Sequence, residues 1–488
     1  MSHPHEIVIG LEVHVQLLTD SKLFCGCSAK FGSPPNTQTC PVCLGLPGSL
    51  PVMNRKAFEL SVKTALALNC RIAEFCKWDR KNYYYPDLPK GFQTSQFDLP
   101  FSSDGHLTFP CPQTGEPRRI RILRAHLEED AGKSMHDEKS GTADSRVDLN
   151  RVGTPLLEIV SEPDLRSAEE AKIYLTDLKL LLTHLGVSDC NMQEGSLRVD
   201  ANVNLHIDAA KGKVATPIVE VKNMNSFRAV ERAIEYEAAR QYDLWKETGK
   251  KIGDMPKQTW GWNDERGVTL PQRQKEESSD YRYFPEPDLV PVTTTPEEIE
   301  RIRAELGESP EELQHRLQQE FGLTEYDAGV LVNQGRPLVD YYLELADLCG
   351  DPKSASNWMQ QDVMRVLNEQ AMTIDRYPIS AASLAELLKK VQAKEVSTAR
   401  GRDVLAKMIE SGQSAAETMK TLGVEQVDES SLVELCRELL AANPGIVAQV
   451  KEGKAKAAGA LIGQAKQKNP NINPGRVREI CLELIETM

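Results

Sequence analysis

The 488-residue sequence lacks any apolar run close to the roughly 20 residues that span a bilayer. Its first residues, Met-Ser-His-Pro-His-Glu, lack the basic segment and apolar stretch of a signal peptide. We therefore expect no contact with a membrane and a cytoplasmic location. The 11 cysteines are odd in number and mostly isolated, which favours a reducing compartment over a disulfide framework.

An excess of basic residues is also missing, because the formal net charge is −14. This balance argues against nucleic acid as a partner of the whole surface but allows a local basic patch. A phosphate-binding loop is absent too: Gly132-Lys133-Ser134 resembles its end, but the motif requires glycine where Leu127 stands. The hydrophobic fraction of 40% and the charged fraction of 27% are typical of globular proteins with roughly two to four domains at this length.

The most informative stretch covers residues 123–134, where apolar and polar residues alternate as in a half-buried strand. This alternation places Arg124, His126 and Glu128 on one face and Leu127 and Glu129 on the other. Glu128 is followed at once by two more acids, and a bound cation would offset their repulsion. A solvated acidic turn is the alternative interpretation.

Other predicted strands also carry single acids among apolar residues. Glu12 shares a face with His14 in 7–17, Asp200 lies with Arg198 in 197–208, and Glu220 lies in 218–222. Short connections favour an antiparallel sheet. If these strands adjoin that of Glu129, the acids form a basin suited to magnesium and nucleotide phosphates.

Basic residues near these strands have a matching role. Lys81 and Arg198 would then neutralise phosphate oxygens. In the alternative, the acids simply face water. Glu158 lies within an apolar run, so either an ion or Arg151 should compensate its charge.

Two further motifs suggest binding sites. Cys25, Cys27, Cys40 and Cys43 form two close pairs, which favours a structural zinc site over free buried thiols. Tyr83, Tyr84 and Tyr85 follow basic residues and could contact a nucleotide base or RNA, or pack as an edge strand.

The pattern changes to helices near residue 295. Thr295 with Pro296 and Ser167 with Glu170 predict helix starts, the second as a capping box. We expect an α+β fold with a sheet domain over 1–293, a helical domain over 294–410 and a helical tail over 411–488. Residues 441–488 contain seven Lys or Arg against four Glu, so lysines such as 451, 454 and 466 could meet an RNA backbone, or could line a solvated helix face.

Taken together, the motifs resemble the B subunit of the glutamyl/aspartyl-tRNA amidotransferase, the GatB family. The matching segments follow the family order over the chain: 9–14, 84–87, 126–133, 148–158, 195–202, 220–226 and 280–287. The resemblance implies a cradle-like catalytic domain similar to glutamine synthetase, followed by helical and tail domains that hold tRNA. It also implies ATP-dependent phosphorylation of the side-chain carboxylate of Glu-tRNA(Gln) or Asp-tRNA(Asn), followed by amidation.

Residue by residue, the resemblance implies magnesium at Glu12, His14 and Glu129, with Glu128 as the alternative to Glu129. It places Lys81, Asp200 and Glu220 in the lining of the same pocket, and it implies a structural zinc at the cysteines. The sequence has no amidase-type Gly-Ser-Ser nucleophile stretch and no cysteine at its start for a glutaminase. Ammonia is therefore expected from elsewhere, and the resemblance implies a glutamine-hydrolysing A subunit as its source, with a small C subunit that braces the pair.

Two rival hypotheses fit parts of the sequence. A free-standing small-molecule ligase related to glutamine synthetase would amidate free glutamate without tRNA. A non-catalytic tRNA-binding scaffold with a zinc knuckle would leave ATP turnover unaffected by substitution of Glu12 or Asp200.

Overall fold

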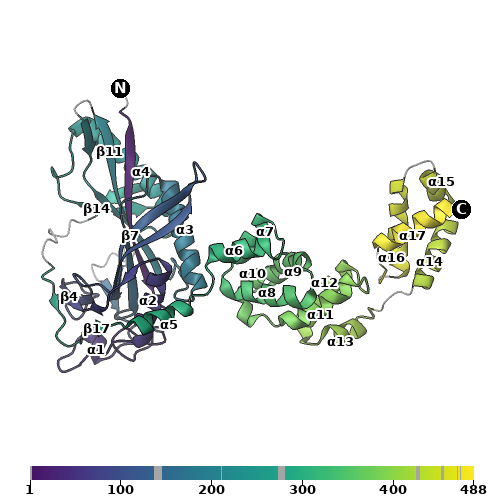
Figure 1. The fold of residues 1–488 in the computed structure, drawn as a ribbon, viewed down its shortest axis with the longest axis horizontal. Coiled ribbons are helices and arrows are strands. Elements are labelled where there is room, and N and C mark those ends of the chain that lie inside the picture. The colour runs from purple at the N-terminus through teal and green to yellow at the C-terminus, as the bar shows by residue number, and fades with distance from the viewer. Residues whose placement is uncertain are drawn as a thin grey trace. The chain divides into compact units, whose positions relative to one another are not determined.

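The computed structural model describes residues 3–136, 145–209, 212–272, 281–424, 429–451, 455–469, 471–472 and 474–487. The chain divides into two compact units, 1–310 and 311–488. The first unit contains the sheets and the second consists of helices (Figure 1). The predicted α+β class is thereby confirmed, whereas the three predicted domains stay a prediction.

The first unit is built on a ten-stranded sheet with the order β15-β14-β13-β11-β1-β10-β7-β6-β2, in which β12 also pairs with β11. All pairs are antiparallel except β13 with β14, which agrees with the largely antiparallel sheet expected. The strands are β1 (His5–Gln16), β2 (Arg71–Ile72), β6 (Ser102–Pro110), β7 (Pro117–Glu129), β10 (Pro155–Ser161), β11 (Leu197–Ala209), β12 (Gly212–Ala215), β13 (Val219–Lys222), β14 (Gln258–Asn263) and β15 (Val268–Pro271).

One face of this sheet is apolar and forms the core of the unit. On β1, Leu11, Val13 and Val15 are buried, and they join one hydrophobic cluster with residues of the helices. Those helices are α2 (Arg55–Ala67), α3 (Ala168–His184) and α4 (Phe227–Thr248), and α3 and α4 lie alongside the sheet in Figure 1. Because side chains alternate along a strand, the polar residues between these apolar ones face the other way.

Smaller elements frame the sheet. A three-stranded sheet has the order β16-β4-β5, and two-stranded sheets pair β17 with β3 and β8 with β9. These strands are β3 (Phe75–Cys76), β4 (Asp79–Asn82), β5 (Phe92–Ser95), β8 (Lys133–His136), β9 (Ser145–Asp148), β16 (Phe284–Pro285) and β17 (Val292–Thr293). The first unit also contains the short helices α1 (Pro41–Leu44) and α5 (Pro296–Ala304).

The described residues of the second unit form helices and their connections, without strands. Its α-helices are α6 (Pro310–Gln319), α7 (Glu325–Val332), α8 (Arg336–Cys349), α9 (Pro352–Trp358), α10 (Met364–Glu369), α11 (Ala381–Gln392), α12 (Thr398–Ser411), α13 (Ala415–Thr421), α14 (Glu429–Ala442), α15 (Pro444–Lys451), α16 (Gly459–Lys468) and α17 (Pro474–Thr487). Helices α14, α16 and α17 share an apolar cluster of their own. Lys451 and Lys466 lie on α15 and α16, and Lys454 falls outside the described residues.

Two helix starts test the sequence interpretation in detail. Thr295 caps α5 in a complete capping box with Glu298. Ser167 accepts from the backbone N–H of Glu170, but the Glu170 carboxylate accepts from the N–H of Arg166 instead of returning to Ser167. The capping box predicted there is therefore only half formed. No helix within the described residues is long and apolar enough to cross a membrane.

Candidate functional site

The predicted acidic strands are neighbours in the sheet. The order β13-β11-β1-β10-β7 places all five side by side. In their register, Glu12 lies opposite Asp200, and His14 lies between Arg198 and Glu158. Glu158 in turn lies opposite His126, and Glu220 opposite Asn202. Directly opposed residues point to the same side of a sheet, so these side chains share one surface, which we call the polar face.

One group on the polar face consists of Glu12, Asp200 and Glu220. Single oxygens of the three carboxylates lie within 4.8 Å of one another, so the group could hold a metal ion. Lysines compensate the charges: Lys222 contacts Asp200 and lies 3.5 Å from Glu220, and the Lys257 ammonium lies 3.1 Å from Glu220. Burial opposes ionisation of Glu220, but these two lysines outweigh it and lower its pKa.

A second group consists of His14, Glu128 and Glu158, whose ligand atoms also lie within 4.8 Å of one another. His126 adjoins it, with Nε2 3.2 Å from Glu158 and 3.7 Å from Glu128. Burial opposes protonation of His126, but the two carboxylates raise its pKa to about 9. The histidines in turn hold the pKa of Glu158 well below its ordinary value, against the effect of burial.

From the sequence, either an ion or Arg151 was expected to compensate the charge of Glu158. Arg151 is not its partner in the structure. Arg151 lies on the Asp130 carboxylate, with 3.5 Å between Nε and Oδ2. The compensation comes from His126 and His14 on the two neighbouring strands. Cross-strand contacts of this kind depend on register, which alternation within one strand does not reveal.

Lys81 reaches the second group from β4. Its ammonium lies 5.0 Å from the centre of the Tyr281 ring. Burial disfavours the charged form, but Glu128, Tyr283 and Glu158 outweigh it and raise the pKa of Lys81. The charge on Lys81 is therefore stabilised by nearby acids, and its role at a phosphate stays a prediction.

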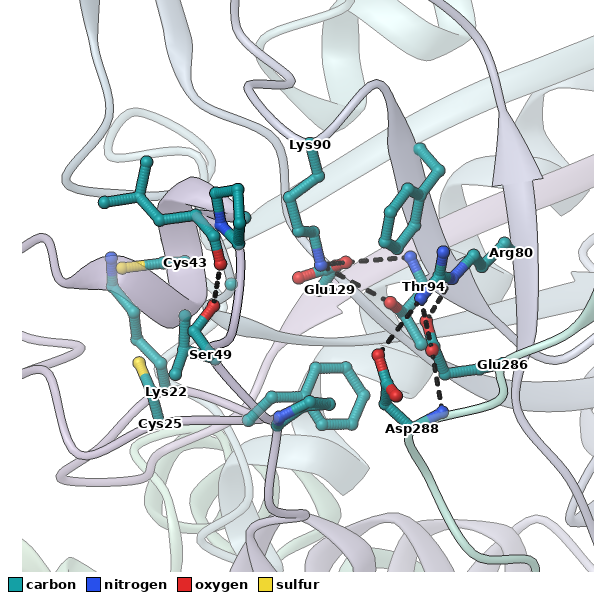
Figure 2. Close-up of a pocket in the computed structure, with 18 of the residues that line it drawn as sticks. Lys22, Cys25, Cys43, Ser49, Arg80, Lys90, Thr94, Glu129, Glu286 and Asp288 are labelled. Carbon is teal, nitrogen blue, oxygen red and sulfur yellow. Dashed lines mark hydrogen bonds and ion pairs between the residues drawn. The ribbon is translucent and has the colours of Figure 1, made fainter.

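Glu129 points to the opposite side from Glu128. Its Oε1 contacts the Lys90 ammonium and accepts a 2.8 Å hydrogen bond from the N–H of Thr94. There it lines a pocket of about 230 Å³, shown in Figure 2 with Lys90, Thr94 and Glu129 close together and Arg80 beside Glu286. Glu129 belongs to neither group on the polar face, whereas Glu128 does. A magnesium role for Glu129 stays a prediction, and the placement favours the alternative, Glu128.

Arg198 is positioned by Asp130 rather than by the acidic groups. Its guanidinium lies 2.8 Å from Asp130, which also accepts from the side chain of Gln16. Burial would raise the pKa of Asp130, but Arg198 and Arg151 outweigh it and lower that pKa. Contact of Arg198 with phosphate stays a prediction. It would require Arg198 to leave or share its ion pair with Asp130.

The predicted cysteine site also assembles. Ligand atoms of Cys25, Cys27, Cys40 and Cys43 lie within 4.8 Å of one another, so the four thiols could hold a metal ion. The hydrogen bond from Cys25 lowers the pKa of Cys43, against burial and with support from nearby Lys22. A cluster of thiols with one low pKa is suited to soft or borderline metals.

Several site residues were not among the predicted ones. His126 and Glu158 had a signal in the sequence, since one alternates with Glu128 and the other interrupts an apolar run. Lys222 follows Glu220 by two residues and so shares its face. Lys257 and Lys90 enter from segments with no sequence signal that ties them to the acids.

The first unit is an α+β domain that gathers acids, histidines and lysines on one face of its sheet. Residues 7–300 match the family model described as the GatB/GatE catalytic domain, and residues 340–485 match the GatB domain. The chain belongs to the GatB family. The membership predicted from the sequence, and with it the assignment to a tRNA-dependent amidotransferase of the ligase class, is confirmed.

The relatives match over nearly their full length. A Rhodopirellula baltica protein is 58% identical over 486 residues, which cover 100% of this chain and 98% of the relative. A Moorella thermoacetica protein is 48% identical over 481 residues, which cover 98% of this chain and 99% of the relative. Both are named as the B subunit of an aspartyl/glutamyl-tRNA(Asn/Gln) amidotransferase.

Proposed function

We propose that this chain is the subunit that forms the amide in a tRNA-dependent amidotransferase. It would use ATP to phosphorylate the side-chain carboxylate of Glu-tRNA(Gln), of Asp-tRNA(Asn), or of both. The observation that carries the proposal is the convergence of five strands, which gathers two groups of metal-capable side chains on the polar face. The names of the relatives supply the substrate class.

The chemistry explains why phosphorylation comes first. Ammonia cannot displace oxide from a carboxylate, because oxide is a very poor leaving group. In the first step a carboxylate oxygen attacks the γ-phosphorus of ATP, the bond to the bridging oxygen breaks, and ADP leaves. In the second step ammonia attacks the acyl carbon, the bond to the phosphate oxygen breaks, and the nitrogen loses a proton.

The polar face supplies what these steps require. Bound Mg²⁺ would stabilise negative charge on the transferred phosphoryl group. Glu12, Asp200 and Glu220 offer the oxygen ligands that Mg²⁺ prefers, and Glu128 and Glu158 offer a second set beside His14. Lysines already neutralise the first set, so a metal there would have to displace ammonium groups. Lys81, half-buried on β4 with its ammonium over the Tyr281 ring, would neutralise phosphate oxygens.

We also propose that the four cysteines hold a structural zinc. The sulfurs of Cys40 and Cys43 lie 3.7 Å apart, and those of Cys27 and Cys43 lie 4.0 Å apart. Four sulfurs placed tetrahedrally at about 2.3 Å from zinc would be about 3.8 Å apart, so the arrangement fits the ion. Four thiolates leave no coordination position for a substrate, so the ion would staple the segment 25–43.

The proposal includes partners and a location. Ammonia would come from a glutaminase A subunit, and a small C subunit would complete a heterotrimer. The helical unit would hold the tRNA, with the lysines of 441–488 near its phosphates. A reducing cytoplasm agrees with the 11 cysteines, all of which are free thiols.

The test is amidation of mischarged tRNA by the reconstituted complex, with ammonium chloride as the nitrogen donor. This donor removes glutamine hydrolysis from the assay. Asp200→Asn should slow amidation about 10²–10³-fold, because it removes one electrostatic element of the site. Asp208→Asn is the matched control, since Asp208 is exposed at the end of the same strand. An Asp200→Asn complex that amidates at the wild-type rate would overturn the proposal.

The same assay separates the two rivals. A free-standing ligase would amidate free glutamate in the absence of tRNA. A non-catalytic scaffold would leave ATP turnover unchanged in Asp200→Asn and Glu12→Gln. The proposed function predicts that neither result occurs.

A further inference from the structure

An aromatic cluster borders the polar face and has no part in the chemistry described above. Phe97 and Tyr283 stack with ring centres 4.1 Å apart and planes inclined by 10°. Tyr281 meets Tyr283 edge-on at 6.0 Å, and Tyr83 meets Tyr281 at 6.1 Å. We call Phe97, Tyr283, Tyr281 and Tyr83 the aromatic cluster.

The cluster adjoins the cation and the acids of the site. Lys81 lies over the Tyr281 ring. The charges of Lys81 and Glu128 both act on the hydroxyl of Tyr283, whose pKa burial raises. The backbone carbonyl of Phe97 accepts a 3.2 Å hydrogen bond from Arg124, which lies two residues before His126 on β7. Lys81 thus lies against the cluster, and Ser95, two residues before Phe97, donates a 3.1 Å hydrogen bond to Glu128 of the second acidic group.

Exposure distinguishes Phe97 from aromatic residues that serve the core. Phe97 is 47% exposed although its ring stacks on Tyr283, whereas nearby Phe101 is fully buried. An exposed ring contributes little to folding, because only buried apolar area is stabilising. A flat, half-exposed aromatic pair offers the surface on which nucleobases stack.

We propose that the aromatic cluster binds the adenine base of ATP, with the polyphosphate directed toward Lys81. This inference rests on the proposed function. The cluster adjoins both a lysine suited to phosphates and acids suited to a metal, the groups that accompany the base in a bound nucleoside triphosphate. The terminal adenosine of a tRNA also presents a base beside a phosphate, and the two Michaelis constants compared below distinguish these two ligands.

The experiment compares Michaelis constants in the reconstituted complex. The KM for ATP and the KM for mischarged tRNA are measured with ammonium chloride as donor, for wild type, Phe97→Leu and Phe97→Trp. Leucine keeps an apolar side chain but removes the aromatic plane, and tryptophan restores that plane. Phe75→Leu is the matched control, because Phe75 is 45% exposed in the same unit. Thermal unfolding checks that all variants fold.

Phe97→Leu should raise the KM for ATP about 5- to 100-fold, the range that base–aromatic stacking supports. Its KM for tRNA should stay unchanged, and Phe97→Trp should restore the wild-type KM for ATP. An unchanged KM for ATP in Phe97→Leu would overturn the inference while leaving the proposed function intact. A rise confined to the KM for tRNA would also overturn it and would place the RNA terminus on the cluster. A wild-type complex that needs no ATP would refute the proposed function itself.

Discussion

Asp130 offers the sharpest test of the packing beneath the site. Its side chain is only 2% exposed, and its carboxylate accepts from Gln16 at 2.8 Å and from the N–H of Ala131 at 2.9 Å. Arg198 lies 2.8 Å away and Arg151 3.5 Å away. Replacing Asp130 by Asn removes the charge and leaves both guanidinium groups without their counter-ion.

Breaking a fully buried ion pair costs about 3–5 kcal/mol. Here Arg198 and Arg151 retain 34% and 29% exposure, so water recovers part of the loss. We therefore expect Asp130→Asn to lower the free energy of unfolding by about 2–4 kcal/mol at pH 7. The control is Asp104→Asn: the pair with Arg71 is exposed, and its loss should leave unfolding unchanged.

The assay is urea unfolding followed by tryptophan fluorescence. Four of the five tryptophans, at 78, 245, 260 and 262, lie in the first unit, so the signal reports mainly on that unit. The two-unit chain need not unfold in one step, and the transition of the first unit is the one to compare.

The dependence on pH follows from the lowered pKa of Asp130. A carboxylate with a depressed pKa stabilises the fold above its unfolded pKa of about 3.9, and this stabilisation disappears as the pH falls through the folded pKa. The difference between wild type and Asp130→Asn should therefore be full at pH 7 and shrink below about pH 4. A difference that is absent at pH 7, or that grows in acid, would refute the reasoning.

Two further predictions concern the framework of the first unit. Cys40→Ser should reduce the zinc that survives gel filtration from about one ion per chain to nearly none, because it removes one of four ligands. Cys111→Ser, outside the group, should retain the ion, and equal zinc contents would contradict the assignment. Gly105→Ala should lower the free energy of unfolding by about 1–3 kcal/mol, because the new methyl group would lie 2.8 Å from the carbonyl oxygen of Leu68 and against the sulfur of Cys70. Unfolding midpoints in urea measure this effect. A midpoint equal to that of wild type would show that the space around residue 105 accommodates a methyl group.

The sequence predicted the faces of the strands well, because alternation with period two is a local property. The alternation in β1 and β11 placed Glu12 with His14, and Asp200 with Arg198, and the register agrees. It also separated Glu128 from Glu129, although family likeness favoured Glu129 for magnesium. The side-chain placement follows the alternation.

The order of the strands and the partners of each charge were beyond sequence reasoning. Glu158 finds His126 and His14 because β10 lies between β7 and β1, a long-range arrangement with no local signal. Lys257 reaches Glu220 just before β14, whose parallel pairing with β13 was not predicted. Lys90 meets Glu129 because residues 39 apart in sequence become neighbours.

The central claim is that acids from separate strands jointly hold a metal bound to the nucleotide. Its most direct test is the Mg²⁺ concentration that gives half-maximal transfer of labelled phosphate from ATP to the carboxylate of mischarged tRNA. Glu128→Gln should raise this concentration about tenfold or more, because it weakens one ligand set, whereas Glu129→Gln should raise it far less. If Glu128→Gln leaves the Mg²⁺ requirement at the wild-type value, the polar face does not hold the metal in the way described.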